Sequence, residues 1–327
     1  MTRPLELVLL LALPASGKSE VRKYLASVSD AEALRDFHMG PTVQLDDYPY
    51  VHLMRRISEE LRGMGHDGIF FDSSELPMKE ARDWGTLIEL VNEDHVHLST
   101  RPRIAPASAA QWLLERYDAA RRKVGADPAF GKLPAGVRSK LESAIEADAK
   151  QLLDDKLVEI GKAKDLRGKT IVVEFARGGP QGSAMPLPAP LGYRYSLAQL
   201  SDAMLERASI LYIWVTPEES RRKNEERAKP GREGDASILH HGVPIAVMLG
   251  DYGTDDMGWL IETSDRPDTV RIETRGKVFH LPVARFDNRI DKTSFVRDDR
   301  SKWPAESVRA LHKGLGEALG RLAAARG

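Results

Sequence analysis

The chain contains no cysteine among its 327 residues. This absence excludes a disulfide scaffold, a thiol nucleophile, and a zinc or iron–sulfur site built on cysteine. No apolar run approaches the roughly 20 residues that span a bilayer. Neither sign of charge is in excess, because 48 Lys and Arg stand against 49 Asp and Glu, for a net charge of −1. This balance excludes a globally basic nucleic-acid binder and an acidic disordered tail, but leaves room for a local basic patch.

The composition is that of a globular protein with a sizeable core, since 42% of the residues are hydrophobic and 30% are charged. At roughly 150 residues per domain, the length predicts one large domain or two modest ones. Residues 1–16 have an Arg, a short apolar run and a small-residue end, as a secretory signal does. However, Glu6 precedes the apolar run, and the segment continues directly into Gly17-Lys18-Ser19. We therefore expect a buried strand here, and a cytoplasmic protein.

Five short apolar runs with β-branched residues, each bounded by polar residues, Gly or Pro, predict strands. They span residues 5–12, 42–46, 170–175, 209–215 and 279–286. The first, third and fourth read as continuous apolar runs, which is expected of parallel strands covered on both faces. Capping boxes and amphipathic patterns predict helices between the strands. This alternation indicates an α/β fold with a parallel sheet and right-handed crossovers.

One connection is abnormally long. Over a hundred residues, mostly helical by pattern, separate the second and third predicted strands, whereas a crossover needs only a dozen or so. We expect residues 64–167 to form an inserted helical subdomain that caps the substrate, and residues 1–63 and 168–327 to form the core. Pro- and Gly-rich stretches at 178–192 and 228–234 are typical of long functional loops.

The sharpest motif follows the first predicted strand and opens a helix, as a phosphate-binding loop does. Backbone N–H groups of such a loop converge on phosphate oxygens, and its glycine permits close approach. Lys18 would place a charge on the β- and γ-phosphates, the Ser19 hydroxyl would ligate Mg²⁺, and the helix dipole would favour the anion. The alternative, an accidental Gly-Lys-Ser in a turn, does not account for strand, spacing and helix together. The nucleotide-binding residues predicted from this motif are Ala12, Leu13, Pro14, Ala15, Ser16, Gly17, Lys18, Ser19 and Glu20, with Ala12 in place of the usual first Gly.

The segment LVLLLALPASGKSEVRKYL resembles the start of the P-loop kinases, within the P-loop nucleoside triphosphate hydrolases. This group includes nucleoside and nucleotide kinases, gluconate and shikimate kinases, chloramphenicol phosphotransferase, polynucleotide kinases and zeta toxins. The resemblance is specific over residues 5–25, weaker over the later strands and absent over the insertion. It implies a three-layer α/β fold with a five-stranded parallel sheet ordered 2-3-1-4-5, and phosphoryl transfer from ATP.

Acidic residues end two of the predicted strands. Asp46 and Asp47 end the second strand and would face the same crevice as the loop. Several of the resembling kinases have a similar Asp-Asp-aromatic sequence there, which implies that one Asp accepts the substrate proton or holds Mg²⁺ through water. Asp46 is favoured because it ends the strand directly; the alternative is a turn or helix-cap carboxylate. Glu174 resembles the second phosphate-loop signature, whose carboxylate reaches Mg²⁺ or the attacking group; the alternative is a solvated strand-end Glu.

The resemblance implies two further elements. A lid at about 217–240 would bring Arg221 and Arg227 to the transferring phosphoryl group, where they would neutralise charge. The alternative is a solvated helix with Arg–Glu pairs four residues apart. Asn288 follows the last predicted strand, where related kinases place a loop against the adenine, so it would contact the nucleotide; the alternative is an ordinary Asx turn.

Together these interpretations predict an ATP- and Mg²⁺-dependent kinase acting on a hydroxyl of a small molecule or nucleotide-like acceptor, with no membrane partner and nucleic acid not favoured. Two alternatives stay open. One is a nucleotide-regulated ATPase or binding protein whose insertion engages RNA or protein. The other is a polynucleotide or nucleotide-sugar kinase with a larger acceptor. The predicted catalytic residues are Lys18, Asp46, Asp47, Glu174, Arg221 and Arg227, and the predicted Mg²⁺ ligands are Ser19, Asp46 and Glu174.

Overall fold

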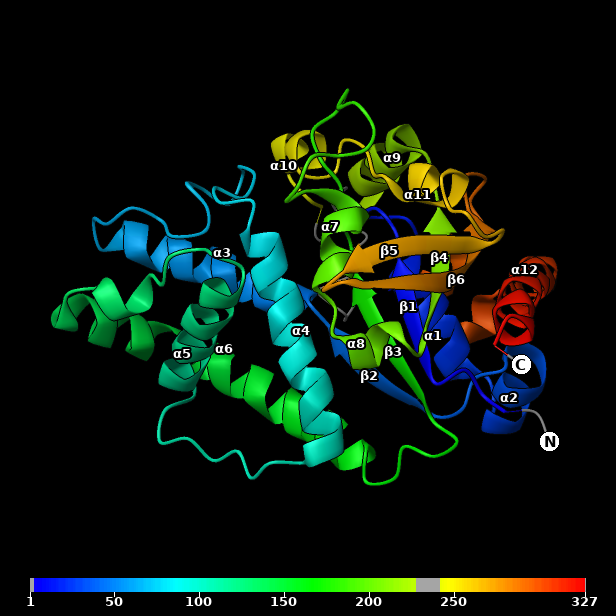
Figure 1. Cartoon of the computed structure of the whole chain (residues 1–327), viewed down its shortest axis with the longest axis horizontal. Helices are drawn as coiled ribbons and strands as arrows, with labels where there is room; N and C mark the ends of the chain where they lie inside the picture. Colours follow the sequence, from blue (N-terminus) through cyan, green and yellow to red (C-terminus); the bar gives the residue numbers. More distant parts are fainter. Residues whose placement is uncertain (1–2, 228–241, 327) are drawn as a thin grey trace.

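The computed structural model describes residues 3–227 and 242–326. They form an α/β fold in which helices cover both faces of one six-stranded sheet, and a group of helices extends beyond one edge of that sheet (Figure 1). Within these described ranges, no helix has both the length and the apolarity needed to cross a membrane.

The sheet has the order β2-β3-β1-β4-β6-β5. Its parallel strands are β1 (Leu7–Leu11), β2 (Thr42–Asp46), β3 (Thr170–Phe175), β4 (Ala208–Trp214) and β6 (Lys277–Asp287). All five predicted strands are therefore confirmed, and in their own numbering they lie in the predicted order 2-3-1-4-5.

The sheet has one strand more than the five predicted, and this sixth strand is antiparallel. β5 (Thr269–Thr274) pairs antiparallel with β6 to form a hairpin at the edge of the sheet. Arg275 and Gly276, which join the two strands, both have positive φ, at 50° and 71°. This is the conformation that a tight two-residue hairpin turn requires.

β1 lies at the centre of the sheet, and all five of its residues are buried. Successive strand residues face opposite sides, so Leu9 packs on one face with α4 (Asp83–Thr100) and α7 (Gly192–Gln199), whereas Leu10 packs on the other. The helices of that second face are α1 (Lys18–Ser27), α2 (Asp30–Phe37) and α12 (Ala305–Ala324). Outside the segment between β2 and β3, the described residues also form α8 (Asp202–Leu205), α9 (Pro217–Arg227), α10 (Ile245–Gly250) and α11 (Met257–Glu262). Short 3₁₀ turns lie at Phe130–Lys132, Ser294–Arg297 and Arg300–Lys302.

The helical insertion between β2 and β3 is confirmed. It contains α4, α5 (Ala109–Lys123) and α6 (Ala135–Lys162), and it follows α3 (Tyr48–Gly63) directly. Leu53 and Ile57 of α3 pack with α5 and α6 in a hydrophobic cluster separate from those of the sheet. α6 also meets the outer edge of β2, where a Glu159 carboxylate oxygen accepts the Gln44 backbone N–H at 2.8 Å.

Candidate functional site

The loop between β1 and α1 has the backbone shape of an anion-binding loop. Ala15 and Gly17 adopt left-handed conformations, with φ of 56° and 104°, and α1 begins at the next residue, Lys18. Left-handed residues just before a helix N-terminus allow successive N–H groups to converge on one anion. The Ser16 hydroxyl is buried and has no hydrogen-bond partner in the described chain. The backbone conformation of the loop is therefore one that suits an anion such as a phosphate group.

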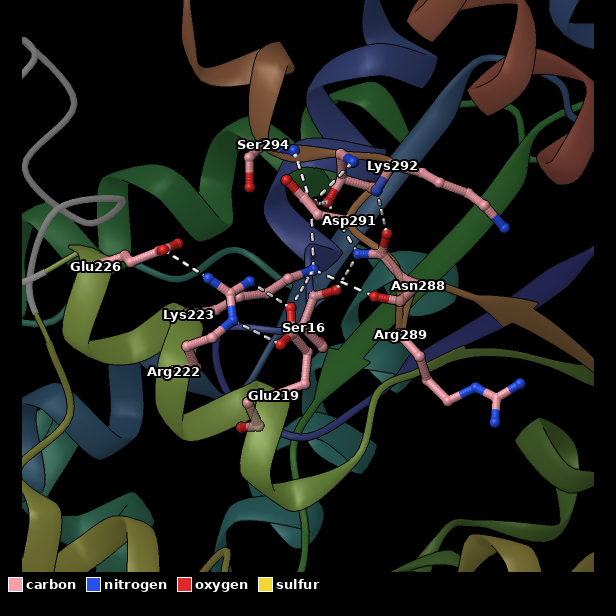
Figure 2. Close-up of polar contacts among 12 residues, drawn as sticks. Ser16, Glu219, Arg222, Lys223, Glu226, Asn288, Arg289, Asp291, Lys292 and Ser294 are labelled. Carbon is pink, nitrogen blue, oxygen red and sulfur yellow. Dashed lines mark hydrogen bonds and ion pairs between the residues drawn. The ribbon is translucent and has the colours of Figure 1, made fainter.

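Both the backbone conformation of Gly17 and the atoms around it leave no room for a side chain at this position. A Cβ atom at this position would lie 2.4 Å from Thr293 Oγ1 and 2.8 Å from Asn288 Nδ2. The Asn288 amide donates to the Ser16 carbonyl at 2.7 Å and to Thr293 Oγ1 at 2.9 Å (Figure 2). Because Asn288 is fully buried, its amide positions the loop backbone. Its predicted contact with the nucleotide stays a prediction.

Helix α9 also contacts this loop. The Ser220 hydroxyl donates to the Pro14 carbonyl at 2.7 Å. Lys223, which is buried, points toward the segment after β6 and donates to Asp291 at 3.1 Å and to the Asn288 carbonyl at 3.3 Å (Figure 2). The loop is thus held by residues that follow β4 and β6, far along the sequence. The sequence analysis did not predict these contacts.

The residues that follow Gly17 point in different directions. Lys18 Nζ donates to the Ala12 carbonyl at 3.2 Å, so its ammonium group lies against the loop itself. Ser19 is half-buried in the first turn of α1. Glu20 is buried, and its carboxylate pairs at 2.6 Å with Arg297, so the predicted nucleotide-binding segment ends in a structural ion pair.

Asp46 and Glu174 come together at the carboxyl ends of β2 and β3. The strand register pairs them with each other and places Glu174 beside Leu10 of β1. Arg22, on α1, lies 3.3 Å from Asp46 Oδ2 and 3.1 Å from Glu174 Oε2; only the contact with Asp46 has hydrogen-bond geometry. Burial, with the nearby Asp46 charge, raises the pKa of Glu174 to about 7, against the opposing effect of Arg22. With the Ser19 hydroxyl, these carboxylates offer the oxygen ligands that Mg²⁺ prefers.

Arg22 is a site residue that the sequence reasoning missed. It lies four residues after Lys18 on a helix, and residues at that spacing share a face. Burial works against its charged form, yet the Glu174 and Asp46 carboxylates leave the pKa of Arg22 above its ordinary value. The guanidinium therefore stays charged and holds the two acids together.

Asp47 lies in a different environment from Asp46. Its buried carboxylate accepts a 2.6 Å hydrogen bond from Arg177, which also donates to the Ser196 hydroxyl at 2.9 Å. The Arg177 guanidinium stacks near Trp84, 5.0 Å from the ring centre. Burial raises the pKa of Asp47 to about 6, although the Arg177 charge opposes this shift. The sequence analysis treated Asp46 and Asp47 as one motif, whereas in the structure their carboxylates contact different arginines, Arg22 and Arg177.

The basic helix predicted as part of a lid is α9. Arg221 lies 3.2 Å from Glu218, and its second terminal nitrogen is buried without a hydrogen-bond partner in the described chain. Arg222 pairs with Glu219 and Glu226 on the exposed face, as the solvated-helix alternative expects (Figure 2). The Arg227 side chain and the predicted lid residues 228–240 lie outside the described residues.

Comparison with protein-family models finds no match to this chain, and comparison with curated proteins also finds none. The fold therefore rests on the structure alone. It is an α/β fold whose mostly parallel sheet, ordered 2-3-1-4-6-5, is consistent with a Rossmann-like or a P-loop fold.

Proposed function

We propose that this chain is a P-loop kinase that transfers the γ-phosphoryl group of Mg-ATP to a hydroxyl of a small or nucleotide-like acceptor. The observation that supports this most is the loop from Ala12 to Ser19. Gly17 there combines a left-handed conformation with a space too small for any side chain, and the loop opens directly into the N-terminus of α1.

Each site residue has a separate task in this proposal. The loop N–H groups and Lys18 bind the phosphates, and Ser19 with Glu174 would hold Mg²⁺. When bound, that ion neutralises charge on the phosphates. Asp46 is the candidate base for the acceptor hydroxyl, because it lies at the strand end and keeps 23% of its side chain exposed. Arg22 positions both carboxylates through its bridging contact.

The direct test is Lys18→Ala. Loss of the ammonium group should weaken Mg-ATP binding or abolish turnover, because the phosphate charge loses its closest counter-charge, while the fold survives. Lys23→Ala is the matched control, since Lys23 lies on the same helix and donates only to the exposed carbonyls of Arg297 and Asp298 among the described residues. Calorimetry with Mg-ATP measures the affinity. Wild-type affinity and turnover in Lys18→Ala would refute the phosphate-loop interpretation.

A second candidate is a nucleotide-regulated protein whose insertion engages RNA or another protein. The separate hydrophobic cluster of α3, α5 and α6 favours it, because this cluster gives the insertion a core of its own. ATP consumption separates the two candidates. Turnover that rises with a hydroxyl compound of low molecular weight supports the kinase, whereas turnover that rises only with RNA or protein supports the regulated binding protein.

A further inference from the structure

Helices α2 and α12 bring two carboxylates and a histidine together. His312 Nε2 lies 3.3 Å from Asp36 Oδ2, and His312 Nδ1 lies 3.9 Å from Glu32 Oε1. One nitrogen or oxygen atom from each of these side chains lies within 4.8 Å of the other two. Across residues 3–227 and 242–326, no other three His, Cys, Asp or Glu side chains come this close. The proposed kinase reaction makes no use of this cluster.

The histidine ring is oriented by two neighbours. Its Nδ1 is hydrogen-bonded to the Tyr24 hydroxyl at 2.9 Å, and its ring centre lies 4.7 Å from that of Phe37. A histidine that binds a metal through one ring nitrogen usually has the other nitrogen in such a hydrogen bond. In the tautomer in which Nδ1–H donates to the hydroxyl, Nε2 presents its lone pair toward Asp36.

The spacing and the charge of the cluster suit zinc. Nitrogen and oxygen ligands lie about 2.0–2.1 Å from a tetrahedral zinc ion, which places two of them about 3.3 Å apart. This is the separation of His312 Nε2 and Asp36 Oδ2. Glu32 lies on the same face of α2, and 36% of its side chain is exposed, so it can move to complete the set. Two carboxylates balance a divalent charge, and the imidazole favours zinc over Mg²⁺ and Ca²⁺, which take oxygen ligands.

The cluster is accessible, and it has cations nearby. Glu32 and His312 line a cavity of about 370 Å³. Asp36 also accepts hydrogen bonds from Arg35 at 2.6 and 2.7 Å, but an exposed pair contributes little to stability, and the carboxylate keeps lone pairs for a metal. Three further cationic side chains that line the cavity are Arg300, Arg309 and Lys313. Their charge opposes that of a metal ion, so both carboxylates are needed to offset it.

We propose that Glu32, Asp36 and His312 bind one zinc ion, His312 through Nε2, with water in the fourth position of a tetrahedral site. Because the ligands come from α2 and α12, the ion links two helices that lie far apart in the sequence. This site is independent of the phosphate loop and of the proposed kinase activity.

Calorimetry of the full chain with Zn²⁺, after dialysis against a chelator, tests the site. Excess Mg²⁺ is present throughout, because it competes for the all-oxygen site proposed beside the phosphate loop and not for a site with an imidazole ligand. Wild-type protein should bind one zinc ion per chain under these conditions. His312→Ala and Asp36→Asn should each lose this binding.

Two more variants separate metal binding from a structural role of the cluster. Tyr24→Phe removes only the hydrogen-bond partner of His312 Nδ1 and should weaken zinc binding roughly 10–100-fold. His280→Ala is the matched control, because His280 also meets a carboxylate, that of Asp265 at 2.5 Å, but is not part of the cluster. It should bind zinc as the wild type does.

Four results would overturn the proposal. If wild-type protein takes up no zinc in excess Mg²⁺, the cluster is an ion pair only. If either His312→Ala or Asp36→Asn keeps wild-type affinity, zinc binds elsewhere. If Tyr24→Phe keeps wild-type affinity, Nε2 is not the ligand atom. If His280→Ala loses zinc as well, the losses are not specific to the cluster. The first measurement uses only the wild-type protein, so it stands even if a variant fails to fold.

Discussion

Replacing Asp47 by alanine is the sharpest test that the two adjacent aspartates, Asp46 and Asp47, have different roles. Arg177 has only 2% of its side chain exposed, and its guanidinium lies 5.0 and 5.1 Å from the Trp84 and Phe175 ring centres. Without Asp47, a buried cation would lose its counter-charge. Breaking a buried ion pair in this way costs about 3–5 kcal/mol, a large part of the roughly 5–15 kcal/mol that stabilises a typical domain.

Asp46→Ala is the matched control on the neighbouring residue. Asp46 and Arg22 keep 23% and 35% of their side chains exposed, and Arg22 would still contact Glu174. A partly exposed pair contributes less than about 1 kcal/mol. Urea denaturation should therefore show a large loss of unfolding free energy in Asp47→Ala and a small one in Asp46→Ala. Turnover should show the reverse order, because a general base contributes roughly 10²–10⁴-fold.

A double variant checks the cause of the loss. Asp47→Leu with Arg177→Met removes both charges and should recover stability relative to Asp47→Ala, since apolar replacement of a buried pair is often neutral. The reasoning fails if Asp47→Ala loses less than about 1 kcal/mol and its turnover falls as far as that of Asp46→Ala. Asp47 would then be the catalytic base.

Three other variants have defined outcomes. Burial raises the folded pKa of Glu174 from 4.5 to about 7, so the folded state binds the extra proton and this group's contribution to stability falls as pH rises through that range. In denaturation experiments Glu174→Gln should therefore gain stability on wild type at pH 8 and none near pH 4. Its turnover should need more Mg²⁺. Gly17→Ala should abolish ATP binding in calorimetry, because its Cβ would overlap Thr293, whereas Gly63→Ala, with nothing within 4 Å, should bind normally. Asn288→Ala leaves the Ser16 carbonyl without its donor and should weaken ATP binding about tenfold, with about 1–3 kcal/mol lost in thermal unfolding.

The parts of the fold that the sequence predicted were those with a strong local pattern. The continuous apolar runs of the central strands are required by burial on both faces, so they are visible without knowledge of their neighbours. β5 was missed although its alternation of buried and exposed residues, with Arg271 and Glu273 on the exposed side, is the ordinary pattern of a half-buried strand. Its turn, Arg275-Gly276, was the available signal, although Arg is not the residue usually found there.

The same distinction between local patterns and contacts of distant residues applies to the candidate site. The loop motif is local and was predicted. The residues that hold the loop in place were not, because they come from distant segments, such as Asn288, which contacts Ser16, and Ser220, which contacts Pro14. No spacing rule connects such residues. Asp47 was misleading for a related reason, because its partner Arg177 is 130 positions away and is brought to it only by the pairing of β2 with β3.

The contact between Glu159 and the outer edge of β2 has a consequence for self-association. An edge strand offers unpaired backbone groups on which another chain can add a strand. Here the Gln44 N–H is occupied by a carboxylate from α6, so the insertion blocks the free edge with both a helix and a negative charge. β2 pairs with β3, which follows the insertion in the sequence, so a chain in which α6 has not docked leaves this edge of β2 uncovered. We therefore expect the insertion to reduce edge-to-edge aggregation, and expect the exposed edge to matter most before the insertion docks.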